Sequence, residues 1–158
     1  MFKLVAPSIV YSPGDPWITL LGRLSLLPAL PVSGDGRATY QPVWADDAAA
    51  VTTALLNGRG ADGGGRVELA GPEALSYDDI VKVVLRSLGR RRRLLHVPLP
   101  VVRSGLRALE AAVGTSSAFA TWEEAQLMEI SMTSARGTAD AEALGVTPLR
   151  MSAVLGAS

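Results

Sequence analysis

The sequence predicts an α/β fold with parallel strand pairing, and three observations support this. Apolar residues make up 48 % of the 158-residue chain and charged residues only 19 %, which is enough apolar material for a packed core. Short apolar runs alternate along the chain with stretches of helical spacing. Glycine and proline mark most of the boundaries between these segments. We therefore expect a single α/β domain over residues 1–158.

The first strand and helix are expected before residue 30. Residues 2–11 form a mostly apolar run that ends at Ser12-Pro13-Gly14, which is typical of a buried parallel strand. Residues 17–27 have helical spacing, and Pro28 would stop that helix. A turn is expected over residues 33–36 because of its glycine and aspartate content.

A second extended segment and an alanine-rich helix should follow. The extended segment covers residues 40–44, and Asp46 and Asp47 then begin a helix that reaches about Leu56. Carboxylates at a helix start oppose the macrodipole and accept from unpaired N–H groups, so both aspartates have an expected structural role. Residues 57–65 are a glycine-rich loop.

The second half repeats the alternation. Residues 66–70 are an expected strand, and Ser76 with Asp79 forms a capping box for a helix that Gly89 closes. Residues 94–98 form another short strand. Helices are then expected over residues 101–113, 121–129 and 138–144, with a last turn over residues 151–155.

Charge and composition exclude several classes of function. The chain has 15 basic and 15 acidic residues, and a zero net charge argues against nucleic-acid binding. It contains no cysteine and one histidine, which excludes a disulfide framework and leaves little material for a metal site or a Ser-His-Asp relay. The most apolar segment, residues 24–32, is too short to span a membrane, and no signal peptide is evident. We expect a cytoplasmic protein without a metal.

Several motifs have both a functional and a structural interpretation. Gly58, Gly60 and Gly63 match the spacing of a dinucleotide fingerprint, but they follow a helix and precede a strand, so we interpret them as a linker. Residues 90–93, all arginine, could bind a phosphate or an acidic partner, although a solvated helix-to-strand corner is favoured. We expect His96 to lie within a strand, with the hydrogen-bonding groups of its ring satisfied inside the protein.

The sequence favours neither of two acid–base arrangements. Asp15, Asp46 and Asp47 could act as paired carboxylates, but local hydrogen bonding at a turn and a helix start explains all three. No tyrosine is followed four residues later by lysine, so the sequence holds no Tyr-x-x-x-Lys dyad that would lower a phenol pKa.

Several segments, in order, resemble the extended and atypical short-chain dehydrogenases/reductases. Residues 7–15 (PSIVYSPGD) are similar to the family's R-P-S-x-V-Y-G-P-G-D strand. Residues 34–36 (GDG) and 40–49 (YQPVWADDAA) are similar to its G-D-G…P-V-x-V-x-D-V-A segment. The next strand and helix match residues 67–73 and 75–81, and the closing segment matches LGVTP over residues 144–148. The nearest branch includes the nucleotide-binding accessory subunit of respiratory complex I and epimerase-like proteins.

The resemblance implies the C-terminal half of such a protein, with part of a Rossmann-like parallel sheet and a small, mostly helical substrate-binding subdomain. The family's glycine-rich phosphate loop and Tyr-x-x-x-Lys would lie upstream, in an N-terminal dinucleotide-binding half. It further implies cofactor contacts at Pro7, Ser8 and Ile9, mostly through the backbone, and a substrate wall that includes the side chains Tyr40, Gln41 and Trp44. NAD or NADP would bind only if an N-terminal half completes the fold.

Three functional hypotheses follow. In the first, the chain is the inactive substrate-binding portion of an NAD(P)-dependent oxidoreductase or epimerase. In the second, it is a non-catalytic binding or assembly module derived from that family. A free-standing enzyme is disfavoured because the acid–base dyad is missing. A parallel strand over residues 2–11 would expose an apolar face and an unpaired edge. We therefore expect a protein partner or a homodimer at that strand, besides a small-molecule substrate.

Overall fold

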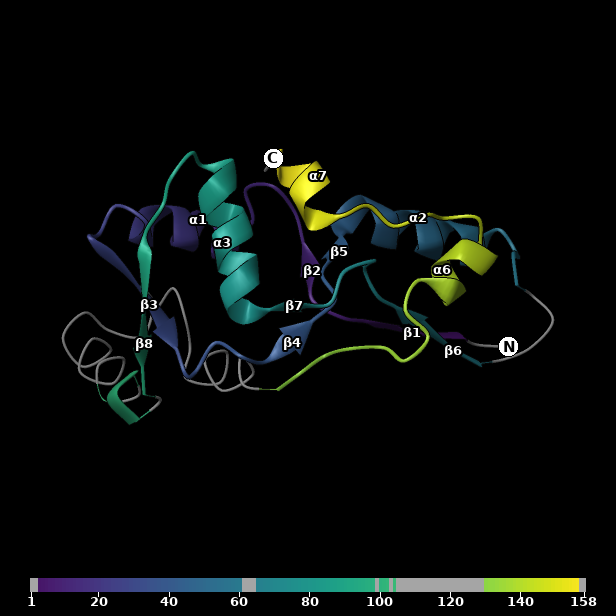
Figure 1. Ribbon diagram of the computed structural model, residues 1–158. Coiled ribbons are helices and arrows are strands. Elements are labelled where there is room, and N and C mark those ends of the chain that lie inside the picture. The colour runs from purple at the N-terminus through teal and green to yellow at the C-terminus, as the bar shows by residue number, and fades with distance from the viewer. Residues whose placement is uncertain (1–2, 61–64, 99, 103, 105–129, 157–158) are drawn as a thin grey trace. The chain divides into compact units, whose positions relative to one another are not determined.

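The computed structural model describes residues 3–60, 65–98, 100–102, 104 and 130–156 (Figure 1). The helix expected over residues 121–129, and most of the one expected over residues 101–113, lie outside the described residues. The elements up to the glycine-rich loop are β1 (Lys3–Pro7), β2 (Val10–Tyr11), α1 (Pro16–Leu24), β3 (Ala29–Ser33), β4 (Thr39–Tyr40), β5 (Val43–Trp44) and α2 (Ala45–Leu56). Those that follow are β6 (Gly65–Leu69), β7 (Leu75–Ser76), α3 (Tyr77–Ser87), β8 (Arg93–Val97), α6 (Ala139–Ala143) and α7 (Met151–Leu155).

The chain divides into two compact units within the expected 1–158 domain. Unit 1 comprises residues 1–13, 39–75 and 132–158, and unit 2 comprises residues 14–38 and 76–131. Each unit is therefore assembled from segments that are distant in sequence.

Unit 1 includes two parallel strand pairs among its described residues. β1 pairs with β6 from Lys3 opposite Gly65 to Pro7 opposite Leu69, and β2 pairs with β5. Helices α2 and α6 lie beside these strands (Figure 1). The core cluster joins strands and helices through Val43, Val51, Ala54, Leu69, Ala141 and Leu144. Because Val5 and Val67 pack against this cluster, one face of the β1–β6 pair is covered.

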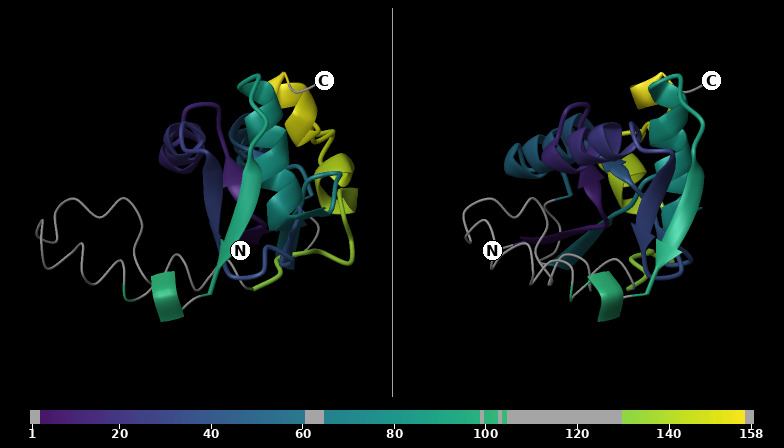
Figure 2. Two further views of the ribbon diagram at one scale, coloured as in Figure 1. Left: turned by 60° about the vertical axis from the view of Figure 1, so that its left-hand side comes forward. Right: turned by 90° about the vertical axis from the view of Figure 1, so that its left-hand side faces the viewer.

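Among its described residues, unit 2 includes the strands β3 and β8 and the helices α1 and α3. β3 pairs with β8 from Ala29 opposite Arg93 to Ser33 opposite Val97, and the strands lie side by side in Figure 2. α1 packs against α3, whose apolar face includes the buried residues Ile80, Val83 and Val84. A capping side chain starts each helix: Asp15 accepts from the Ile18 amide, and Ser76 accepts from the Asp79 amide.

The structure confirms an α/β fold with parallel pairing and corrects several expected elements. The expected strand over residues 2–11 is two strands, because the chain leaves the β6 pairing after Pro7 and joins β5 at Val10. β3 was not expected, since Pro31 interrupts its sequence. Proline is tolerated there because, among the described strands, β3 pairs only with β8 and keeps a free edge.

The two aspartates expected to cap α2 play different parts. Trp44 occupies the N-cap of α2 and makes no side-chain capping bond. Asp47 is 8 % exposed, and its Oδ2 accepts from the Leu149 amide at 2.8 Å, which ties the C-terminal segment to α2. Asp46 is exposed in the first turn, where its charge opposes the helix dipole.

No helix in the described segments has both the length and the apolar character that crossing a bilayer demands.

Candidate functional site

The carboxyl ends of β1 and β6 form the candidate site in unit 1. In open α/β sheets, ligands bind outside the carboxyl ends of the strands, so this edge is where chemistry is expected. The chain leaves β1 at the exposed Pro7, and the Ser8 amide continues the pairing by donating to the Leu69 carbonyl at 2.8 Å. The Ile9 carbonyl then accepts from the Val43 amide at 2.9 Å.

The Ser8 hydroxyl joins three segments of unit 1. Its Oγ donates to the Met132 carbonyl at 2.7 Å and accepts from the backbone N–H of Gln41 at 3.2 Å. A hydroxyl has one proton to donate, so the proton of Ser8 is already used within the protein. The side chain fixes the turn after β1, and its hydroxyl has no proton left to donate to a ligand.

Gln41 is buried, and both ends of its amide are bonded to the backbone. Its Nε2 donates to the Gly71 carbonyl at 3.3 Å, and its Oε1 accepts from the Ser134 amide at 2.6 Å. Gly71 approaches so closely that a Cβ placed on it would lie 1.8 Å from the Pro42 carbonyl oxygen. Glycine is therefore required at this position, which follows β6.

A polar cluster continues from Ser134 along β6. The Ser134 hydroxyl donates to Glu68 Oε2 at 2.6 Å, and the Glu68 amide donates to Asp140 Oδ2 at 2.9 Å. Asp140 is 8 % exposed and is paired with Arg136, whose Nη2 lies 2.5 Å from its Oδ1. The cluster holds the segment after residue 131 against β6, and sequence reasoning missed it.

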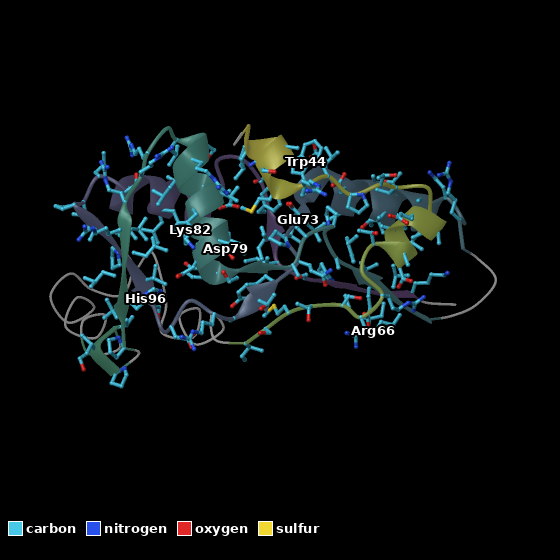
Figure 3. All side chains as sticks on the ribbon, viewed as in Figure 1. Trp44, Arg66, Glu73, Asp79, Lys82 and His96 are labelled. Carbon is cyan, nitrogen blue, oxygen red and sulfur yellow. The ribbon has the colours of Figure 1, made fainter. Side chains whose placement is uncertain are left out.

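The other predicted substrate residues differ in their exposure. Tyr40 is 2 % exposed, whereas Trp44 is partly exposed at the end of β5 (Figure 3). The structure thus brings Ser8 into direct contact with the backbone of Gln41. Trp44 follows Gln41 closely in the sequence and lies at the start of α2. Their roles toward cofactor and substrate stay predictions.

Two buried tyrosines have phenols that resist ionisation. Tyr11 is 1 % exposed, and burial, with the charges of Asp47 and Glu73 adding to it, raises its pKa far above the usual value. Its hydroxyl has no hydrogen-bond partner among the described residues. Burial also raises the pKa of Tyr77, against the opposing effect of its hydrogen bond with Trp17. Neither phenol is suited to act as a base near neutral pH.

The ring of His96 is hydrogen-bonded, as expected, and its partner is a carboxylate within unit 2. Its Nε2 lies 3.0 and 3.1 Å from the two carboxylate oxygens of Asp78 in the first turn of α3. Gly36 leaves the space for this pair, since a Cβ there would lie 2.0 Å from Asp78 Oδ1, and its φ of +68° also favours glycine. In the part of the chain that the structure describes, no three potential ligand side chains gather as they would around a metal ion.

Comparison with known proteins identifies the fold. No family model matches the chain. The human epimerase family protein SDR39U1, solved with NADPH, has a TM-score of 0.64 and 19 % identity, with 96 % of this chain and 45 % of that chain covered. UDP-glucose 4-epimerase from Thermotoga maritima, solved with UDP-glucose, has a TM-score of 0.61 and 14 % identity, with 97 % and 43 % covered. The fold is that of the epimerase-type short-chain dehydrogenases/reductases.

The resemblance in fold inferred from the sequence is therefore confirmed. The chain spans less than half the length of these short-chain dehydrogenase structures. Among curated proteins, it is 26 % identical over 90 residues to the mitochondrial NADH dehydrogenase (ubiquinone) 1 alpha subcomplex subunit 9 of Arabidopsis thaliana. That alignment covers 57 % of this chain and 22 % of the relative.

Proposed function

We propose that this chain is the substrate-binding portion of an NAD(P)-dependent oxidoreductase or epimerase of the short-chain dehydrogenase family, without activity as it stands. The open β1–β6 pair supports this best. Among the described strands, β1 pairs only with β6, and Leu4 of β1 is 58 % exposed. Parallel strands are normally buried on both faces. Further strands from a dinucleotide-binding segment would complete such a sheet.

We infer that the turn after β1 would contact a nicotinamide cofactor through its backbone. Pro7 is exposed at the carboxyl edge of the strand, and hydrogen bonds on both sides hold Ser8 and Ile9 in place. Such a fixed turn can present main-chain atoms without reorganisation when a ligand arrives. Bound there, NAD or NADP would supply hydride transfer. The proposed contacts are Pro7, Ser8 and Ile9, with the Ser8 side chain acting as the positioning group.

Trp44 is the best-placed residue of the proposed substrate wall. Its indole is partly exposed, and its backbone is held at the junction of β5 and α2. Tyr40 and Gln41 are buried and would support the wall from within. No acid–base pair is proposed in this chain, because Tyr11 and Tyr77 have raised pKa values and the sequence contains no Tyr-x-x-x-Lys.

Complementation tests this function. The chain is mixed with the dinucleotide-binding half of a short-chain dehydrogenase that carries the glycine-rich loop, and NADH and NADPH binding is followed by fluorescence. Restored binding is expected with the wild-type chain and should be weakened by Leu4→Asp, which places a charge on the open face of β1. The matched control is Leu56→Asp in α2, where the native side chain is 83 % exposed. Equal restoration by both variants, or no restoration by the wild-type chain, would refute the proposal.

A non-catalytic assembly module derived from the same family is the second candidate. The complex I relative, which is named as a subunit of a larger assembly, favours it. This candidate predicts a stable complex with another protein through the β1 edge but no restored cofactor binding. The intact mass of the natural gene product separates the two: a mass near 16.5 kDa favours the module, and a larger mass favours a portion of a complete reductase. We propose the cytoplasm as the location in either case.

A further inference from the structure

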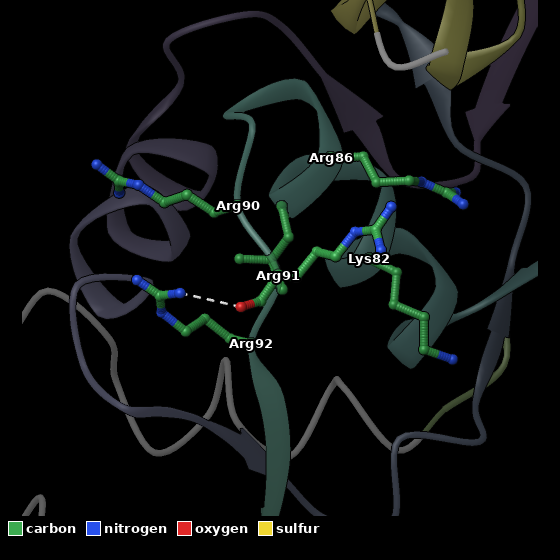
Figure 4. A pocket seen from close by; sticks show the side chains of 6 residues that line it. Lys82, Arg86, Arg90, Arg91 and Arg92 are labelled. Carbon is green, nitrogen blue, oxygen red and sulfur yellow. Dashed lines mark hydrogen bonds between the residues drawn. The ribbon is translucent and has the colours of Figure 1, made fainter.

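A strongly basic pocket lies in unit 2, where α3 ends and the chain leads into β8 (Figure 4). Its volume is about 290 Å³. The residues that line it are Lys82, Leu85, Arg86, Arg90, Arg91 and Arg92. All but one of these are cationic, and the exception, Leu85, is 3 % exposed. The pocket therefore has an apolar, buried residue among its cations.

The pocket contains far more positive than negative charge. The sequence has no acidic residue between Asp79 and Glu110, although six of its 15 basic residues lie within residues 82–93. In the described part of the chain, the carboxylate that contacts a lining cation is that of Asp79, whose Oδ1 lies 3.0 Å from Lys82 Nζ. Five cations with one carboxylate neighbour leave a large net positive charge in a chain that is neutral overall.

Two of the arginines have a structural role. Arg90 Nη1 donates to the Gly22 carbonyl at 3.0 Å and to Ser25 Oγ at 2.5 Å. Arg92 Nε donates to the Ser25 carbonyl at 2.8 Å, and Ser25 is fully buried. These bonds satisfy polar groups at the C-terminal end of α1. They also fix the backbone on both sides of Arg91.

The remaining cations extend to the other side of the pocket. In Figure 4 the side chains of Lys82, Arg86 and Arg91 extend away from those of Arg90 and Arg92. Neither Arg86 nor Arg91 pairs with a carboxylate among the described residues. The dipole of α3 attracts a cation at the last turn of the helix, and Arg86 occupies that turn. Because this attraction falls off beyond the last turn, the dipole explains the position of only one of these two cations. Further like charges repel one another unless an anion is present.

We propose that this pocket binds an oligophosphate, as a free anion or as the phosphate chain of a nucleotide, through Lys82, Arg86 and Arg91. Guanidinium groups bind phosphate oxygens in a bidentate manner, and an ammonium adds a compact charge. The volume suits a compact anion, since it lies just below the range of roughly 300–1,000 Å³ that is usual for small-ligand pockets. The site goes beyond the proposed cofactor and substrate contacts, which lie in unit 1, and does not depend on them.

Calorimetric titration of the full chain tests the site. The probes are inorganic diphosphate, inorganic triphosphate, ADP and ATP, each in magnesium-free buffer. We expect one anion per chain, with an affinity that falls as the salt concentration rises from about 50 to about 200 mM. Arg86→Gln and Arg91→Gln should each weaken binding about tenfold, as expected for the loss of a charged hydrogen bond. Arg66→Gln removes the same charge from an exposed side chain of unit 1 and should leave the affinity unchanged.

The probes also identify the source of the phosphate. Tighter binding of ADP than of diphosphate supports a nucleotide, and equal binding supports an oligophosphate alone. The proposal is overturned if none of the four probes binds at millimolar concentration, or if Arg66→Gln weakens binding as much as Arg91→Gln. It is also overturned if a poly-glutamate peptide binds as tightly as triphosphate, which would assign the pocket to an acidic protein surface. Circular dichroism of each variant verifies that the fold is intact.

Discussion

Truncating Gln41 tests whether this residue has the structural role that its contacts indicate. Its amide bonds the Gly71 carbonyl and the Ser134 amide inside unit 1. Each hydrogen bond contributes about 1 kcal/mol net, and a buried group left unpaired costs about 1–3 kcal/mol. Gln41→Ala breaks both bonds, so we expect the free energy of unfolding to fall by about 2–4 kcal/mol. That is a large share of the roughly 5–15 kcal/mol typical of a domain.

Urea denaturation measures this loss. With a slope of about 2 kcal/mol per M, the midpoint should fall by about 1–2 M. Gln41→Met keeps most of the side-chain volume, so the stability lost in this variant reports the hydrogen bonds with little contribution from a cavity. The control is Thr52→Ala on α2, which removes one exposed bond to the Ala48 carbonyl and should change stability by less than about 0.5 kcal/mol. Wild-type stability in Gln41→Met would refute the reasoning.

Three further predictions concern single residues. Gly71→Ala should cost about 3 kcal/mol or more, because its Cβ would overlap the Pro42 carbonyl; a thermal midpoint like that of the wild type would contradict this close approach. Ser76→Ala should cost about 1 kcal/mol in urea denaturation, since it removes the bond to the Asp79 amide, and an unchanged midpoint would mean that another group caps α3. Burial raises the pKa of Tyr11 in the folded protein, so ionising this phenol costs more in the folded than in the unfolded chain. The stability that its neutral form provides is therefore fully present below about pH 10 and is lost as the pH rises above that value. Tyr11→Phe should weaken that alkaline loss, and identical urea midpoints of mutant and wild type from pH 8 to 11 would count against it.

Local sequence determined where several elements begin and end. Asp15 and Ser76 start α1 and α3 because each accepts from an amide three residues later, an interaction that needs no tertiary contact. The glycine-rich loop follows α2 and precedes β6, which is the order of elements that the sequence predicted. The alternation of apolar runs and helical spacing likewise predicted parallel pairing.

Long-range contacts decided the rest. Asp47 looked like a helix-start residue, but it holds the Leu149 amide, which lies 102 residues further along the chain. Gln41 was predicted as part of a substrate wall, and its amide is instead bonded to segments 30 and 93 residues away. The run of arginines was expected to be a solvated corner, and residues 91–93 are indeed exposed. Only the fold shows that residues 90–92 also line a pocket with Lys82, and that Arg90 and Arg92 are bonded to the end of α1.

The physical reason for this division is the range of the interactions. Capping bonds, turn conformations and hydrophobic periodicity act over a few residues, so the sequence by itself specified the α/β class and most of the helices. Buried polar groups take whatever partner the fold brings to them, because leaving them unpaired is costly. The partners of Ser8, Gln41 and Asp47, and the pocket that the arginines line, were therefore decided only by the tertiary structure.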